Sequence, residues 1–102
     1  MTGSRLDAFR RMVEKSPNNA LARFGLANEA LKAGDHALAA EQLTAYLALY
    51  DDEGNGWLRL GDCLSALGRR DESRAAYEKG IAAAERYGHS GMAEELRARL
   101  QG

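Results

Sequence analysis

The side chains that most often perform chemistry in proteins are few in this chain and poorly spaced for it. Cys63 is the single cysteine, and His36 and His89 are the two histidines. A zinc site needs three or four such ligands close together, and neither histidine is near Cys63 in the sequence, so we expect no metal site. Asp62 directly precedes Cys63, and a neighbouring carboxylate raises the pKa of a thiol and reduces its nucleophilicity. Cys63 is therefore expected to be a packing residue.

Short charged runs are the other candidates for chemistry. The acidic run at 51–53 could suggest calcium, but the alternating ligands and central glycine of a calcium loop are missing, so a solvated turn is the better interpretation. The arginine pairs at 10–11 and 69–70 have acidic neighbours and no aromatic platform for nucleic-acid bases. No nucleophile, base and orienting group can be assembled from the residues present. We expect a non-enzymatic protein without cofactor or metal.

Composition narrows the class of protein and its partners. The chain has 102 residues, a length that predicts one domain. Its formal net charge is −1, so it lacks the positive field that attracts nucleic acid. Its apolar runs are far shorter than the roughly 20 residues that cross a bilayer. The N-terminus lacks the apolar core of a signal peptide, and one cysteine cannot form an internal disulfide. We expect a cytoplasmic protein that binds neither membrane nor nucleic acid.

Two glycines reveal an internal repeat. Gly34 and Gly68 each follow a run with helical apolar periodicity, where a glycine can cap the end of a helix, and they stand 34 residues apart. When residues 20–53 are laid over 54–87, large apolar residues and small residues fall in the same places. Leu43 lies over Tyr77, and small Ala27 lies over Gly61. This pattern predicts pairs of antiparallel helices that approach closely at their small residues.

The core positions follow from the same periodicity. One stripe of each first helix should face the interior; the two stripes contain Leu26, Ala27, Ala30 and Ala33, and Leu60, Gly61, Leu64 and Leu67. Gly80 lies inside a predicted helix and is expected where the next helix crosses. The predicted helices lie near 4–15, 20–33, 36–50, 55–67, 71–87 and 91–100.

The second repeat resembles a known family. It contains Trp57-x-x-Leu60-Gly61, then Gly68 and then Ala76-Tyr77, and this pattern is similar to the tetratricopeptide repeat. Arg23 and Leu64 depart from it, at positions where tryptophan and tyrosine are usual. The resemblance implies an all-α right-handed solenoid of antiparallel helix pairs, about six helices in all. Its single domain would comprise an N-terminal half repeat (1–19), two repeats (20–53 and 54–87) and a capping helix (88–102), with Trp57 in the core.

The capping helix is expected to be amphipathic. Ser90 is a good candidate for its N-cap. One face would pack back onto the second repeat and the other would meet water; the packing face contains Met92, Ala93, Leu96 and Leu100, and the wet face contains Glu94, Glu95, Arg97 and Arg99.

The resemblance also implies a binding surface, because first helices in this family line a concave groove that holds peptides or partner helices. The residues at these positions are Leu21, Phe24, Asn28 and Leu31 in the first repeat, and Asn55, Leu58, Arg59, Asp62 and Ser65 in the second. Two hypotheses remain open: a module that binds a peptide or helix of a protein partner, and a structural module that forms a homodimer through the exposed flank of its half repeat. The N-terminal helix could instead cover Phe24.

Overall fold

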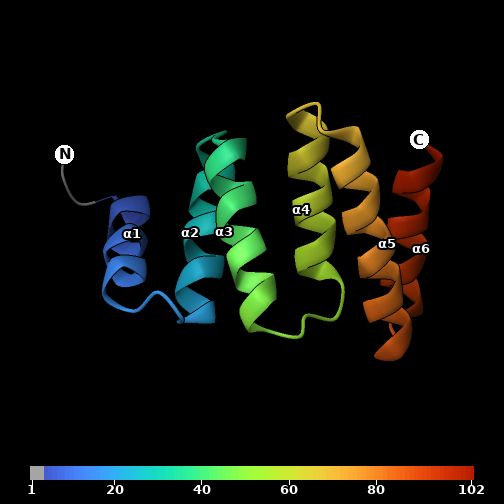
Figure 1. Cartoon of the computed structure of the whole chain (residues 1–102), viewed down its shortest axis with the longest axis horizontal. Helices are drawn as coiled ribbons and strands as arrows, with labels where there is room; N and C mark the ends of the chain where they lie inside the picture. Colours follow the sequence, from blue (N-terminus) through green and yellow to red (C-terminus); the bar gives the residue numbers. More distant parts are fainter. Residues whose placement is uncertain (1–3) are drawn as a thin grey trace. The chain divides into compact units, whose positions relative to one another are not determined.

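The computed structural model describes residues 4–102, and this part of the chain folds into helices joined by short turns (Figure 1). Every predicted helix is present, which confirms the all-α prediction. The helices are α1 (Arg5–Lys15), α2 (Ala20–Lys32), α3 (His36–Leu49), α4 (Asn55–Ala66), α5 (Arg70–Arg86) and α6 (Ser90–Gln101). Residues 1–3 of the predicted half repeat lie outside the described residues.

Local sequence signals explain where these helices begin and end. The side chains of Ser4, Asn19 and Asp35 each accept a hydrogen bond from a backbone N–H in the first turn of the helix that follows. Gly34 and Gly68 lie just beyond α2 and α4 with φ angles of 76° and 77°, in the left-handed region that closes a helix. The two glycines therefore cap their helices as predicted.

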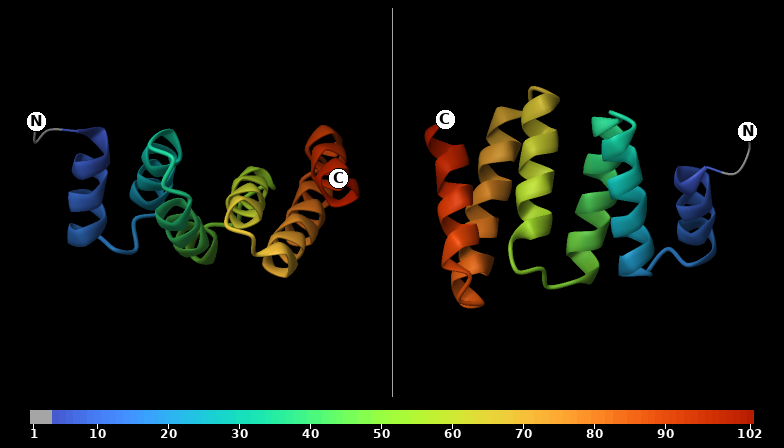
Figure 2. Two further views of the ribbon diagram at one scale, coloured as in Figure 1. Left: turned by 90° about the horizontal axis from the view of Figure 1, so that it is seen from above. Right: turned by 180° about the vertical axis from the view of Figure 1, so that it is seen from behind.

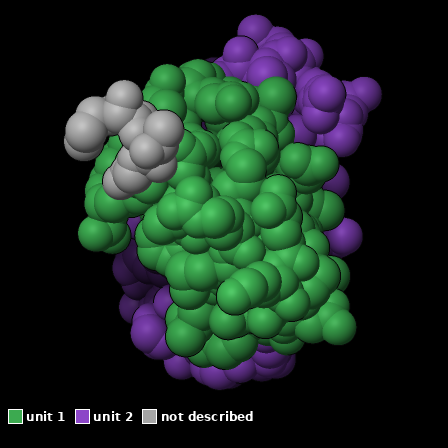
Figure 3. Space-filling model, turned by 90° about the vertical axis from the view of Figure 1, so that its left-hand side faces the viewer, with its two compact units in different colours: residues 1–50 green, residues 51–102 purple. Residues whose placement is uncertain are grey.

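The chain divides after Tyr50 into two compact units, which Figure 3 colours separately. In unit 1 (residues 1–50), α2 and α3 form an antiparallel pair and α1 packs against α2. In unit 2 (residues 51–102), α4 and α5 form the pair and α6 packs against α5, as the views in Figures 1 and 2 agree. Each unit is thus one helical pair with one additional helix.

Each unit has its own apolar core. In unit 1, buried Val13, Ala22 and Leu26 pack with Leu6, Phe9 and Leu38. In unit 2, buried Leu58, Tyr77, Ala84, Ala93 and Leu96 form the core cluster, with Ile81, Met92 and Leu100 packed against it. The predicted apolar face of α6 is therefore confirmed, and it is the side of the helix that faces the pair α4–α5.

Three predictions about the interior are wrong. Leu58 is 8% exposed and belongs to the core of unit 2, although it was expected on an open face. The reason is that α6 supplies Ala93 and Leu96 to the same cluster. Trp57, expected in the core, is only half-buried. Ala33 is exposed because it follows the last residue of α2.

Two predictions about the turns are also wrong. Asp52, expected in a solvated turn, is 2% exposed, and its Oδ1 accepts hydrogen bonds from the backbone N–H groups of Gly54 (2.8 Å) and Gly56 (2.7 Å). It therefore satisfies amides at the start of α4, whose N-cap residue Gly54 has no side chain for this purpose. Ser90 is the first residue of α6 rather than its N-cap, because the chain enters the helix one residue earlier, at His89.

Candidate interaction surfaces

The predicted site residues of unit 1 lie on α2 and are mainly apolar. We call Leu21, Phe24, Asn28 and Leu31 the α2 stripe. Leu21 is 80% exposed, whereas the other three residues are half-buried. A leucine this exposed loses most of the stabilisation that burial gives an apolar side chain, which is about 1.5–3 kcal/mol. A partner that covered Leu21 would recover part of that stabilisation.

Aromatic rings extend this apolar surface from α2 to α3. The ring of Phe24 lies against that of Tyr46, with 4.7 Å between the centroids, and Tyr46 contacts Tyr50 with 5.6 Å between the centroids. Tyr46 is buried, but Tyr50 is 52% exposed. Phe24 is thus anchored by α3, while α1 places Phe9 over the neighbouring Gly25. The interaction of Phe24 with Tyr46 was not predicted, because the tyrosine lies on the second helix of the pair.

The predicted site residues of unit 2 lie on α4 and are mostly polar. Arg59 is half-buried and donates from Nε to Asn55 Oδ1, at 3.4 Å. Asp62 is half-buried and Ser65 is exposed. Leu58 is the exception, since it is the core residue described above. The two units therefore offer surfaces of different chemistry at equivalent positions of the repeat.

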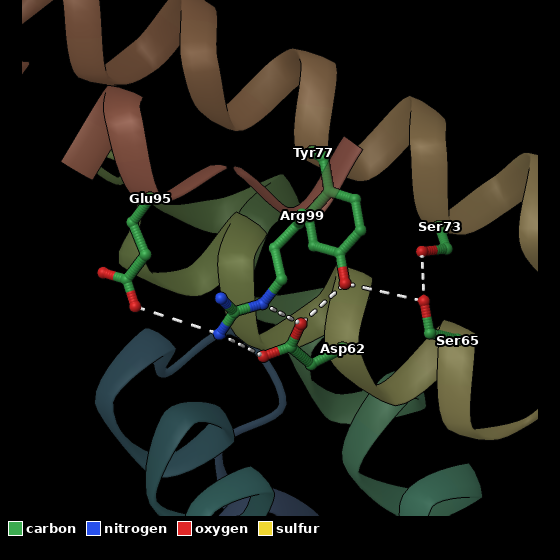
Figure 4. Close-up of polar contacts among 6 residues, drawn as sticks. All are labelled: Asp62, Ser65, Ser73, Tyr77, Glu95 and Arg99. Carbon is green, nitrogen blue, oxygen red and sulfur yellow. Dashed lines mark hydrogen bonds and ion pairs between the residues drawn. The ribbon is translucent and has the colours of Figure 1, made fainter. Parts of the chain in front are cut away.

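Asp62 is the centre of a hydrogen-bonded group that joins three helices (Figure 4). Tyr77 of α5 donates its hydroxyl to Asp62 Oδ1 at 2.6 Å. Arg99 of α6 donates Nε to the same oxygen at 2.9 Å and Nη2 to Oδ2 at 3.2 Å, which is a bidentate pair. We call these residues, with Ser65, Ser73 and Glu95, the Asp62 network.

The remaining members extend the Asp62 network in two directions. The hydroxyls of Ser65 and Ser73 are 2.6 Å apart, and Ser65 lies 3.5 Å from the hydroxyl of Tyr77. Glu95 lies one helical turn before Arg99 and forms an ion pair with it at 3.8 Å. Burial, and then the hydrogen bond to Asp62, raise the pKa of Tyr77, so its hydroxyl stays protonated and remains a donor at neutral pH. Arg99 was predicted only to meet water, and no local sequence signal connects it with Asp62.

A second polar group in unit 2 joins the start of the unit to the end of α5. Tyr87 donates to Asp51 Oδ2 at 2.7 Å, and Arg86 donates to Asp51 Oδ1 at 2.6 Å. The hydrogen bond from Tyr87, opposed by desolvation and assisted by Arg86, lowers the pKa of Asp51. These contacts connect side chains on the surface of unit 2, and sequence analysis did not predict them.

Chemically reactive groups do not gather on either surface. Cys63 is 1% exposed; burial, and then the charge of Asp62, raise the pKa of its thiol, so the predicted effect of Asp62 has the expected direction. Among residues 4–102, no three histidine, cysteine or acidic side chains are close enough together to hold a metal ion. In the same part of the chain, no helix is long and apolar enough to cross a membrane.

Comparison with known proteins identifies sequences that are similar to this chain. A family model described as the tetratricopeptide repeat matches residues 4–54 and again 24–88. A TPR repeat-containing protein of Pseudomonas aeruginosa is 34% identical over 91 residues, which are 89% of this chain and 87% of that protein. The likeness therefore extends over nearly the whole length of both proteins.

Proposed function

Because the chain belongs to the tetratricopeptide repeat family, whose members generally mediate contacts between proteins, we propose that it is a non-enzymatic module that binds a peptide or helix of a partner protein. The observation that carries this proposal is the exposure of Leu21, which is 80% exposed beside the half-buried ring of Phe24. An exposed leucine next to an anchored aromatic ring is the kind of surface that apolar partner side chains cover.

The other residues of the α2 stripe have distinct roles in this proposal. Leu31 extends the apolar contact toward the end of α2, and the amide of Asn28 can orient a peptide backbone by hydrogen bonding. In unit 2, Asn55, Arg59 and Ser65 of α4 form a polar surface of their own. Each unit is described by itself, and the proposal concerns apolar contact with the α2 stripe of unit 1.

The test is to replace Leu21 by glutamate and to compare affinity capture from the native cell extract. Met12→Glu is the matched control, because Met12 is also an exposed apolar side chain, at 44%, but lies on α1. We expect both variants to keep their helical circular dichroism. A protein retained by the wild type and by Met12→Glu should be captured about tenfold less by Leu21→Glu, as for the loss of a central apolar contact. Equal capture by all three proteins would contradict the proposal.

The exposure of Met12 favours a second candidate, in which two copies associate through the outer flank of α1. Met12 is 44% exposed on α1, about 100° around the helix from buried Val13, and a second copy could cover it. Sedimentation velocity at several concentrations separates the two candidates. Self-association that Met12→Glu abolishes and Leu21→Glu leaves intact would support the homodimer.

A further inference from the structure

The dipeptide Asn55–Gly56 at the start of α4 combines two residue types that react with each other in proteins. An asparagine loses its side-chain amide most readily when glycine follows it, because glycine has no side chain to hinder attack by its backbone nitrogen. The chain has four asparagines, and Asn55 is the one that precedes a glycine. Asn55 is therefore the position where the sequence most favours deamidation.

The deamidation of Asn55 needs only this dipeptide and water. The backbone nitrogen of Gly56 loses its proton to hydroxide and bonds to Cγ of Asn55, and the side-chain nitrogen leaves as ammonia. Water then opens the cyclic succinimide at either of its carbonyl groups, which gives aspartate or isoaspartate. The reaction therefore requires that the nitrogen of Gly56 can lose its proton and can approach Cγ of Asn55.

The fold holds the nitrogen of Gly56 in a buried hydrogen bond. Gly56 is buried, and its N–H donates to Oδ1 of Asp52 at 2.7 Å. Asp52 is 2% exposed, and the same oxygen accepts the N–H of Gly54 at 2.8 Å, so two hydrogen bonds keep the carboxylate in place. Loss of the proton from Gly56 would put a second negative charge beside this carboxylate, where little water screens the repulsion. Asp52 therefore opposes the first step of the reaction.

The side chain of Asn55 is restrained as well. Asn55 is the first residue of α4, and its Oδ1 accepts a hydrogen bond from Nε of Arg59, one helical turn further on, at 3.4 Å. Closure of the succinimide ring reorients the side-chain amide and breaks this contact. Both partners of the reaction are thus held in other hydrogen bonds, and the one made by Gly56 is the shorter and the more deeply buried.

We propose that Asn55 is a latent site of spontaneous deamidation, and that the hydrogen bond from Gly56 to Asp52 suppresses the reaction in the folded chain. This inference goes beyond the proposed function, because it involves neither a partner nor the α2 stripe. Conversion to aspartate adds a carboxylate to the polar surface of α4. Conversion to isoaspartate adds a methylene group to the main chain, so the first turn of α4 cannot keep its regular hydrogen bonds.

The experiment follows deamidation of the purified full chain in mildly alkaline buffer, with and without a denaturing concentration of urea. Trypsin releases the peptide 33–59, in which Asn55 is the single asparagine. Mass spectrometry measures the deamidated fraction of this peptide over time, and chromatography separates the aspartate and isoaspartate forms. We expect the folded wild type to react at least about tenfold more slowly than the unfolded chain, because the reactive arrangement is reached only by local opening.

Three variants test whether Asp52 is the reason. Asp52→Ala leaves the N–H of Gly56 without its acceptor, and deamidation of the folded protein should become about tenfold faster. Asp35→Ala is the matched control, because Asp35 also accepts a backbone N–H at a helix start, that of Leu38 at 3.0 Å, but on α3. Its rate should stay within about twofold of the wild type. Asp52→Asn keeps an acceptor oxygen and should react more slowly than Asp52→Ala. Circular dichroism establishes that each variant is folded.

Several outcomes would overturn the inference. It fails if the folded wild type reacts as fast as the chain in urea, or if folded Asp52→Ala reacts no faster than the wild type. Equal acceleration by Asp35→Ala would show that general loosening of the fold is the cause. Equal rates for Asp52→Asn and Asp52→Ala would show that the hydrogen bond is not. If Asp52→Ala does not fold, Asp52→Asn is compared with the wild type, and a rate as high as that of the chain in urea overturns the inference.

Discussion

In both units a glycine on one helix lies under an aromatic ring from a neighbouring helix. In unit 1 the ring comes from the preceding helix, and in unit 2 it comes from the following helix. Gly25 of α2 lies under the ring of Phe9 from α1, the preceding helix. Gly61 of α4 lies under the ring of Tyr77 from α5, the following helix. An added Cβ would lie 2.2 Å from a Phe9 ring carbon in the first case and 2.3 Å from a Tyr77 ring carbon in the second. In both units a glycine is needed because an aromatic ring occupies the space of a side chain.

The two rings differ in what else holds them. Phe9 is half-buried, and the charged group near its ring is the guanidinium of Arg5, 5.9 Å from the ring centroid. Tyr77 is 4% exposed, and its hydroxyl donates to Asp62. A ring that is buried and hydrogen-bonded cannot move aside, whereas a ring on a helix at the edge of a unit can. The same close approach should therefore tolerate substitution differently in the two units.

The largest effect is expected for Gly61→Ala. The new methyl group overlaps the ring of Tyr77, so the α4–α5 pair must separate, and overpacking of this kind typically costs about 1–3 kcal/mol. This cost is partly offset, because alanine favours a helix over glycine by about 1 kcal/mol. Urea unfolding followed by circular dichroism should give a net loss of about 1–2 kcal/mol in the free energy of unfolding, the upper half of the range that remains after the offset.

Gly25→Ala is the matched variant in unit 1. Its methyl group meets Phe9 as closely, but α1 buries only Val13 and can shift outward. We expect a smaller loss, about 1 kcal/mol or less, after the gain in helix propensity. Equal losses for the two variants would show that the ring environment does not matter and would remove the contrast between the units.

A moderate effect is expected for Tyr77→Phe, which gives unit 2 the ring chemistry of unit 1. The change removes the hydrogen bond to Asp62 but keeps the ring over Gly61, so the free energy of unfolding should fall by about 0.5–1.5 kcal/mol. Tyr87→Phe is the control, because Tyr87 also donates to an aspartate but is 47% exposed. Chemical denaturation of both variants should show the greater loss for Tyr77→Phe, and the reverse order would contradict the role of burial.

The smallest expected effect is on the stability of the protein in acid. We compare one carboxylate from each unit. The Tyr87 hydrogen bond lowers the pKa of Asp51 below its ordinary value of 3.8. Desolvation acts to raise the pKa of Glu29, but hydrogen bonds from Lys32 and Arg5 outweigh it and hold the pKa below 4.5. Both carboxylates thus have a folded-state pKa below the unfolded one. Their stabilising contributions are present above the unfolded values and are lost as the pH falls through the folded values.

Asp51→Asn and Glu29→Gln should each reduce the dependence of stability on pH. The measurement is urea unfolding at about pH 5 and about pH 3, where the wild type should lose more stability than either variant. Because Glu29 has the higher ordinary value, its contribution should begin to weaken at the higher pH. An unchanged pH dependence in both variants would contradict the contribution of these contacts.

The sequence contained enough information to place the helices and the close contacts within a pair. Capping residues such as Asn19 and Gly68 act on their own helix, so the ends of that helix can be predicted from the local sequence. The contact of Gly61 with Tyr77 was also predictable, because both positions belong to one repeat. It could not be predicted that Leu58 is buried and Trp57 only half-buried. The burial of Leu58 depends on the side chains that α6 supplies.

Less of the candidate surfaces could be predicted. The residues of the α2 stripe were identified from the repeat, but their exposures, from 80% at Leu21 to half-buried at Phe24, depend on neighbouring helices. Arg99 and Asp62 are 37 positions apart, and a charged residue near the end of a helix gives no indication of its distant partner. Likewise, the acidic run at 51–53 did not indicate which of its carboxylates is buried. These interactions depend on tertiary packing, which periodicity does not specify.

The buried thiol of Cys63 can report how often α4 opens. The chain contains one cysteine, so a thiol reagent has a single place to react, and that thiol is 1% exposed with a raised pKa. Reaction must wait until α4 is uncovered by an opening fluctuation, because the closed state exposes almost none of the sulfur and little of it is thiolate. When reclosing is faster than labelling, the labelling rate of the unmodified chain gives the population of molecules open at α4. No introduced probe is needed for that measurement on the purified protein.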